Sequence, residues 1–143
     1  MYRVYLDNCC FNRPYDDQTY LTIYLESEAK TFIQKEILEG KIELAWSYIL
    51  DFENDVNPYE ARKNAISEWR DIAIIDINVS KEIIELSKSI IQKGIKKKDA
   101  LHIACAIKAN CDYFLTTDKK ILNKNISEII IINPVDFIRR MEV

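Results

Sequence analysis

The sequence predicts a three-layer α/β/α fold, in which helices cover both faces of a central parallel sheet of about four or five strands. Short apolar runs recur along the chain and are separated by longer stretches with helical periodicity. Strands that alternate with helices form parallel sheets through right-handed crossovers, which place helices on both faces. The 143 residues, 48% of them hydrophobic, contain no repeat or linker-like run, so we expect a single domain over residues 1–143.

The first elements are expected to be a short strand, a loop and a long helix. Residues 2–6 form a short apolar run, which is typical of a buried strand. The segment that follows Asp7 is expected to be a loop as far as Pro14, because proline disfavours helix in the residue before it. A helix should then begin with Asp17 as its N-cap and end at Gly40. Its predicted apolar stripe consists of Leu21, Leu25, Ala29, Phe32, Ile33 and Ile37.

The next segment predicts a second strand and a short helix. Residues 42–46 alternate well enough between apolar and polar types for a strand. Ser47 is placed to cap a helix that runs to about Asp55.

A helix start signal of the capping-box kind comes next. Asn57 is the predicted N-cap, Pro58 the first helical residue, and Glu60 lies three residues past the cap. This helix should reach about Trp69. Residues 72–77 after it are either a strand or an extended connector.

The second half of the chain repeats the alternation of helices and strands. The helix from Asp99 is apolar almost all round and should therefore be buried. In chain order, the expected elements are a helix over 80–92 closed by Gly94, a helix from Asp99 to Ala109, a strand over 113–116, a short helix over 119–123, a strand over 129–132 and a helix from Pro134 to about Met141.

Composition excludes several classes of protein. The formal net charge of −3 argues against a protein that coats nucleic acid through bulk positive charge, although an enzyme that acts on phosphodiesters is still possible. The N-terminus lacks a signal peptide, and no apolar run approaches the length of a membrane helix, so we expect a cytoplasmic protein without membrane contact. The four cysteines match no familiar zinc spacing and are expected to be reduced.

Two predicted strands lead into an acidic residue. Asp7 follows the run Val4–Leu6, and Asp118 comes shortly after the run Tyr113–Leu115. The carboxyl ends of parallel strands meet at one edge of the sheet, where ligands bind. Two carboxylates held close together repel each other unless a cation lies between them, and oxygen ligands suit Mg²⁺ or Mn²⁺. The alternative is that each aspartate is a turn or cap residue.

Two further carboxylates are candidates for the same site. Asp99 is expected to be a helix N-cap, from which one oxygen could also reach the site. Glu53 shares a helical face with apolar residues, so its charge needs a partner unless the side chain reaches solvent at the boundary. His102, the only histidine, lies one helical turn after Asp99. We expect it to be packed or close to a substrate rather than bound to a metal.

These residues lie in segments that together resemble the successive signatures of the PIN domain family. The segments are Tyr5–Asn8, Ser47–Glu53, Asp99–Ala104 and Leu115–Asp118. Their order and spacing, and the Asp-Ala-Leu-His-Ile-Ala stretch, make the resemblance specific, and it spans nearly the whole chain. It implies a ribonuclease whose acidic cluster binds one or two Mg²⁺ or Mn²⁺ ions. By position, that cluster would consist of Asp7, Glu53, Asp99 and Asp118.

The resemblance also implies partners. Many bacterial and archaeal members are VapC-type toxins, each neutralised by a small antitoxin protein. The family suggests a homodimer, and a monomer is the alternative that the sequence leaves open. Asn8 departs from the hydroxyl residue that often follows the first aspartate, and residues 9–14 are not the common toxin pattern. The candidate contacts to RNA are Asn8, Asn12, Arg13, Lys97 and Lys98. Arg13 could equally form a surface ion pair.

Two other functions compete with a metal-dependent endoribonuclease. A protein with the same fold could bind RNA or a protein partner without any turnover. A phosphoryl-transfer site like that of a receiver domain or a phosphatase is disfavoured, because no Asp-x-Asp motif follows the first strand and no glycine-rich phosphate loop occurs.

Overall fold

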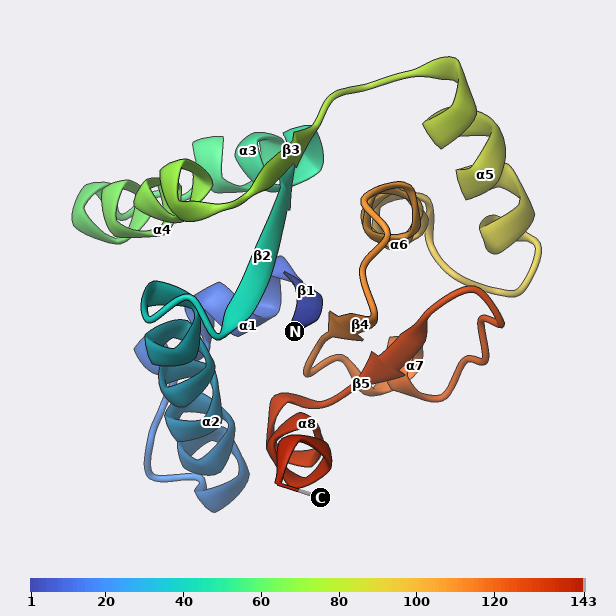
Figure 1. Ribbon diagram of the computed structural model, residues 1–143. Helices are drawn as coiled ribbons and strands as arrows, with labels where there is room; N and C mark the ends of the chain where they lie inside the picture. The colour runs from blue at the N-terminus through green and yellow to red at the C-terminus, as the bar shows by residue number, and fades with distance from the viewer. Residues whose placement is uncertain (143) are drawn as a thin grey trace.

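The computed structural model describes residues 1–142 and contains a five-stranded, wholly parallel sheet with the strand order β3-β2-β1-β4-β5 (Figure 1). The strands are β1 (Tyr2–Leu6), β2 (Ile42–Ser47), β3 (Ile75–Ile77), β4 (Tyr113–Leu115) and β5 (Ile130–Ile132). The helices are α1 (Asn8–Asn12), the 3₁₀ helix η1 (Arg13–Tyr15), α2 (Leu21–Leu38), α3 (Tyr48–Asp55), α4 (Glu60–Ile72), α5 (Lys81–Ile91), α6 (Lys97–Lys108), α7 (Lys119–Leu122) and α8 (Pro134–Met141). The predicted fold class is confirmed.

The sheet is covered on both faces, as expected of parallel strands. On one face, Tyr5 of β1 stacks on Phe114 of β4 and makes an edge contact with His102 of α6. On the other, Tyr113 of β4 packs against Phe137 of α8, which in turn lies beside α2. Val4, Tyr5 and Leu6 are fully buried because β1 is the central strand. The carboxyl ends of β1 and β4 therefore lie together in the middle of the sheet edge.

The prediction of a loop after β1 was wrong, because residues 8–12 form helix α1 and residues 13–15 form η1. Asp7 caps α1 by accepting a hydrogen bond from the backbone N–H of Asn8, which favours a helical turn directly after the strand. Pro14 stands near the start of η1, where the missing N–H of proline costs no hydrogen bond.

The predicted starts of α2 and α4 differ from the observed ones. Asp17 closes a turn by accepting from the backbone N–H of Thr19, and α2 begins only at Leu21. Asn57 similarly accepts from the backbone N–H of Tyr59, so α4 begins at Glu60 and continues to Ile72. Asx turns and N-caps use the same side chains, so sequence patterns separate them poorly.

The start of α6 also differs from the prediction. The helix begins at Lys97 after the N-cap Lys96, which places Asp99 in the first turn rather than at the cap. An acidic residue is favourable in that turn because of the helix dipole. The other predicted caps agree with the structure, since Ser47 and Ser80 accept hydrogen bonds from Leu50 and Ile83 at the starts of α3 and α5.

The buried face of α2 contains only half of the predicted apolar stripe. Ala29, Ile33 and Ile37 are buried as predicted, whereas Leu21, Leu25 and Phe32 are exposed. The buried face includes polar residues, and the most buried of these, Glu26, is satisfied by Arg13 and by Asn133 before α8. Packing against α8 and η1 therefore decided which side of α2 faces inward.

Two further expectations concern the membrane and the cysteines. Among residues 1–142, no helix combines the length and the apolar character needed to cross a lipid bilayer. All four cysteines are free thiols, as expected.

Residues 75–77 pair with β2, which settles the open alternative for the segment over residues 72–77 in favour of a strand.

Candidate metal centre

The four predicted acidic residues line one cleft at the carboxyl edge of the sheet. Asp7 follows β1, Asp118 precedes α7 after β4, Glu53 lies in α3, and Asp99 lies in the first turn of α6. The cleft has a volume of about 340 Å³. Its lining residues are Asp7, Asn8, Cys9, Asn12, Asp16, Glu53, Asp99 and Asp118.

Asp7 is the most buried of these carboxylates, and each of its two oxygens accepts a hydrogen bond. One carboxylate oxygen accepts from the backbone N–H of Asn8 at 2.8 Å, and the other accepts from the hydroxyl of Thr116 at 2.9 Å. The backbone N–H of Asp7 donates to the carbonyl of Leu115, so the β1–β4 ladder fixes its position. Burial raises the pKa of Asp7 well above its ordinary value, which means that the charged form needs a nearby cation.

Asp99 and Asp118 both line the cleft and are close enough for their charges to interact. Burial and the negative charges of Asp118 and Glu53 raise the pKa of Asp99. Asp118 accepts a hydrogen bond from the backbone N–H of Lys120, and its own N–H donates to Thr116. Asp118 is therefore the N-cap of α7, which was one of the alternatives considered for it. Its carboxylate nevertheless lines the cleft.

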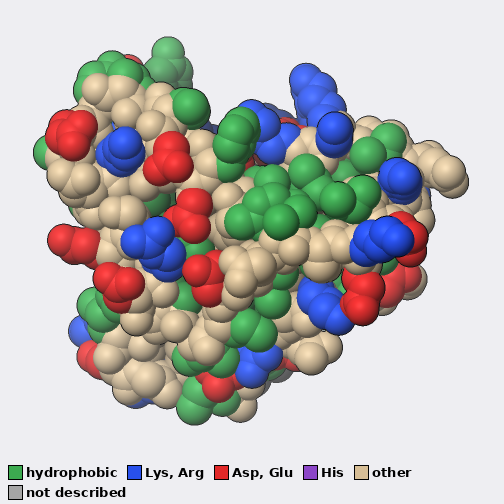
Figure 2. Space-filling model, turned by 90° about the horizontal axis from the view of Figure 1, so that it is seen from above, with side chains coloured by type: hydrophobic (Ala, Val, Ile, Leu, Met, Phe, Trp, Pro, Cys, Tyr) green, Lys and Arg blue, Asp and Glu red, His purple; other side chains and the backbone are tan. Residues whose placement is uncertain are grey.

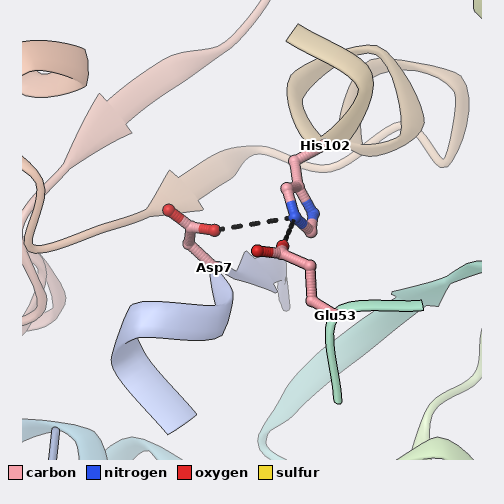
Figure 3. Close-up of side chains that lie close together, drawn as sticks. All are labelled: Asp7, Glu53 and His102. Atoms are coloured by element: carbon pink, nitrogen blue, oxygen red, sulfur yellow. Dashed lines mark hydrogen bonds and ion pairs between the residues drawn. The ribbon is translucent and has the colours of Figure 1, made fainter. Parts of the chain in front are cut away.

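His102 is packed in the interior, as expected, but its contacts with Glu53 and Asp7 were not predicted. The ring is fully buried, and its Nε2 atom contacts Glu53 and lies 4.0 Å from Asp7 (Figure 3). On the other side of the ring, Nδ1 is 2.6 Å from the hydroxyl of Tyr5, which is also 2.6 Å from the hydroxyl of Ser47. The only signal in the sequence was the spacing of one helical turn from Asp99.

The predicted RNA contacts separate into two groups. Asn8 and Asn12 line the acidic cleft. Arg13 does not, because its guanidinium forms ion pairs with Asp16 and with the buried Glu26. The ion-pair alternative for Arg13 is therefore the arrangement that the structure shows.

Lys97 and Lys98 lie outside the acidic cleft. They line a separate apolar groove between α3 and α6 whose other lining residues are Tyr48, Ile49, Phe52 and Leu101. The ammonium of Lys98 lies over the ring of Phe52. Figure 2 shows the face that carries these helices, where hydrophobic side chains gather with Lys and Arg side chains around them.

The donor chemistry of the cleft suits a divalent cation. Ligand atoms of Asp7, Glu53 and His102 all lie within 4.8 Å of one another. Asp99 and Asp118 add two more carboxylates to the lining of the cleft. Like charges gathered in a partly buried cleft are unfavourable without a positive partner, and carboxylate oxygens are the usual protein ligands of Mg²⁺ and Mn²⁺.

Comparisons with known proteins identify the family and the fold. Residues 4–126 match the sequence model of the PIN domain family. A toxin–antitoxin complex from Klebsiella pneumoniae contains a chain of similar structure, with a TM-score of 0.60, 17% identity and coverage of 92% of this chain and 97% of that one. VapBC2 from Rickettsia felis, bound to a promoter DNA fragment, gives a TM-score of 0.55, 17% identity and coverage of 92% and 98%. No curated protein matches the sequence significantly.

Proposed function

Because this chain belongs to the PIN domain family, we propose that it is an endoribonuclease that depends on Mg²⁺ or Mn²⁺. The observation that carries the proposal is the convergence of Asp7, Glu53, Asp99 and Asp118 on one cleft from four separate elements. Each of these side chains comes from a different part of the chain. The stability of the fold does not require all four carboxylates to lie in one cleft.

In this proposal Asp7, Asp99 and Asp118 hold the metal. The hydrogen bonds from Asn8 and Thr116 fix the carboxylate plane of Asp7, so little reorganisation is needed on binding. A divalent ion in such a site activates water and stabilises the negative charge that develops on the leaving oxygen.

Glu53 acts on the attacking water in this scheme. Its carboxylate contacts His102, and the ring of His102 is hydrogen-bonded to the buried hydroxyl of Tyr5. These buried contacts therefore fix the position of Glu53. A carboxylate at the wall of the cleft can orient water and accept its proton. In this scheme Asn8 and Asn12, which line the same cleft, contact phosphate oxygens of the RNA.

We further propose that the nuclease is the toxin of a type II toxin–antitoxin pair. The two solved structures reported above, one titled as a toxin–antitoxin complex and the other as VapBC2, support this, because they cover nearly the whole fold. A small antitoxin protein would then be the partner, and a homodimer is the expected assembly. Expression of the chain alone should arrest growth, and an adjacent small reading frame should relieve the arrest.

The test of the nuclease is RNA cleavage with Mn²⁺ or Mg²⁺, with EDTA, and in the variants Asp7→Asn and Asp55→Asn. Asp55 is exposed on the same helix as Glu53 and does not line the cleft, so it controls for the lost charge. Cleavage should require metal and should be lost only in Asp7→Asn. Cleavage that survives both EDTA and Asp7→Asn would refute the mechanism, and metal and RNA binding without cleavage would indicate the silent binding module.

A further inference from the structure

A positively charged side chain is held between two exposed aromatic rings beside the acidic cleft. The guanidinium carbon of Arg62, in α4, lies 4.3 Å from the ring centroid of Tyr15 and 4.2 Å from that of Tyr59. Tyr15 ends η1, and Tyr59 is the residue before α4. The two tyrosines are 45% and 58% exposed, so the stack presents aromatic surface to solvent.

Arg62 differs from the other arginines of the neighbouring elements in having no acidic partner. Arg13 is paired with Asp16 and Glu26, and Arg70 is paired with Asp51. Within residues 1–142, Arg62 forms no ion pair, and its Nε is buried without a hydrogen-bond partner. No carboxylate of the described residues therefore neutralises this charge.

The stack is continuous with the cleft. Asn12 and Asp16, which line the cleft, lie three residues before and one residue after Tyr15. Asn57, two residues before Tyr59, donates a hydrogen bond of 3.5 Å to the side chain of Asn12. The stack therefore borders the cleft on the side formed by Asn12 and Asp16.

We propose that Tyr15, Arg62 and Tyr59 bind single-stranded RNA, with a base stacked on an exposed tyrosine ring and the guanidinium near a backbone phosphate. Aromatic faces bind bases of any sequence, and arginine adds a charge that attracts phosphate. The acidic cleft alone would repel RNA, so a neighbouring unpaired cation is what a substrate needs there. The inference rests on the proposed function and names where its substrate is held.

The test is fluorescence anisotropy of a labelled single-stranded RNA in EDTA, which separates binding from cleavage. Tyr59→Leu and Tyr15→Leu should each weaken binding about tenfold, the effect expected for one lost base stack. Tyr59→Phe keeps the ring and should bind within about twofold of wild type. Arg62→Gln should weaken binding and lower the slope of log K against log salt by about one.

Tyr24→Leu is the matched control, because Tyr24 is 46% exposed on α2 and does not line the cleft. Its RNA affinity should equal that of wild type, and circular dichroism should show that every variant is folded. Unchanged RNA affinity in Tyr59→Leu, Tyr15→Leu and Arg62→Gln would overturn the inference and assign the stack to packing or to an acidic protein. Because the wild type is assayed separately for cleavage, failure of the nuclease proposal gives a different result from failure of this one.

Discussion

The hydroxyl of Tyr5 links the core of the sheet to the candidate metal centre, so its removal tests how the site is held. Tyr5→Phe deletes one oxygen atom that lies 2.6 Å from both Ser47 and His102. The ring itself is fully buried and stacks on Phe114, and phenylalanine keeps this packing. The substitution therefore isolates the two hydrogen bonds.

The expected cost follows from the burial of both partners. A buried hydrogen bond contributes about 1 kcal/mol net, and a partner left unsatisfied costs about 1 to 3 kcal/mol. Ser47 retains the backbone N–H of Leu50 as a partner, whereas Nδ1 of His102 loses the one hydrogen bond seen on it. We expect the free energy of unfolding to fall by about 2 to 3 kcal/mol, which for a domain of this size lowers Tm by about 6 to 12 °C.

The measurement is denaturant or thermal unfolding at neutral pH, with Tyr2→Phe as the control. Tyr2 is 40% exposed, and its hydroxyl makes no hydrogen bond within residues 1–142, so its loss should change stability by less than about 0.5 kcal/mol. Cleavage by Tyr5→Phe should also fall, because His102 would no longer fix Glu53. Equal stability of Tyr5→Phe and Tyr2→Phe would refute the role of the buried chain.

Three further predictions concern the metal, a buried lysine and a buried carboxylate. Mn²⁺ at a hundredfold excess over Kd should stabilise the wild type by about 3 kcal/mol in thermal unfolding, and Asp7→Asn should abolish this gain. Burial lowers the pKa of Lys30 to about 8, so folding disfavours its charged form below that pH. The free energy of unfolding should therefore rise between about pH 8 and 10. In urea unfolding, Lys30→Met should remove this rise and should increase the free energy of unfolding at pH 7 by about 3 kcal/mol. If wild type and variant show the same dependence of stability on pH, the prediction is wrong. Glu26→Gln weakens the ion pair with Arg13 and should cost about 2 kcal/mol by the same measurement, and no loss would show that Asp16 suffices for Arg13.

Several features of the site follow from local sequence patterns. Short apolar runs and their spacing predict β1 and β4, and a residue that follows a parallel strand must lie at the carboxyl edge of the sheet. Asp7 and Asp118 could therefore be placed together without any knowledge of side-chain contacts. Glu53 could be singled out because a charge on an apolar helical face needs a partner.

Other features depend on contacts between elements that are distant in the sequence. Packing against α8 and η1 determines which face of α2 is buried. The ion pair with Glu26 holds Arg13 outside the cleft. Lys97 and Lys98 are next to Asp99 in the chain, yet the turn of α6 directs them to the neighbouring apolar groove. No pattern within a single segment contains this information.

The amino-acid order alone determined the alternation of strands and helices and the edge of the sheet at which acidic residues gather, because periodicity and strand direction are local properties. The tertiary structure alone decided that His102 joins Asp7 and Glu53 and that Arg62 is enclosed by Tyr15 and Tyr59. The physical reason is that burial, pairing and repulsion act through space, between side chains whose separation along the chain says nothing about their distance.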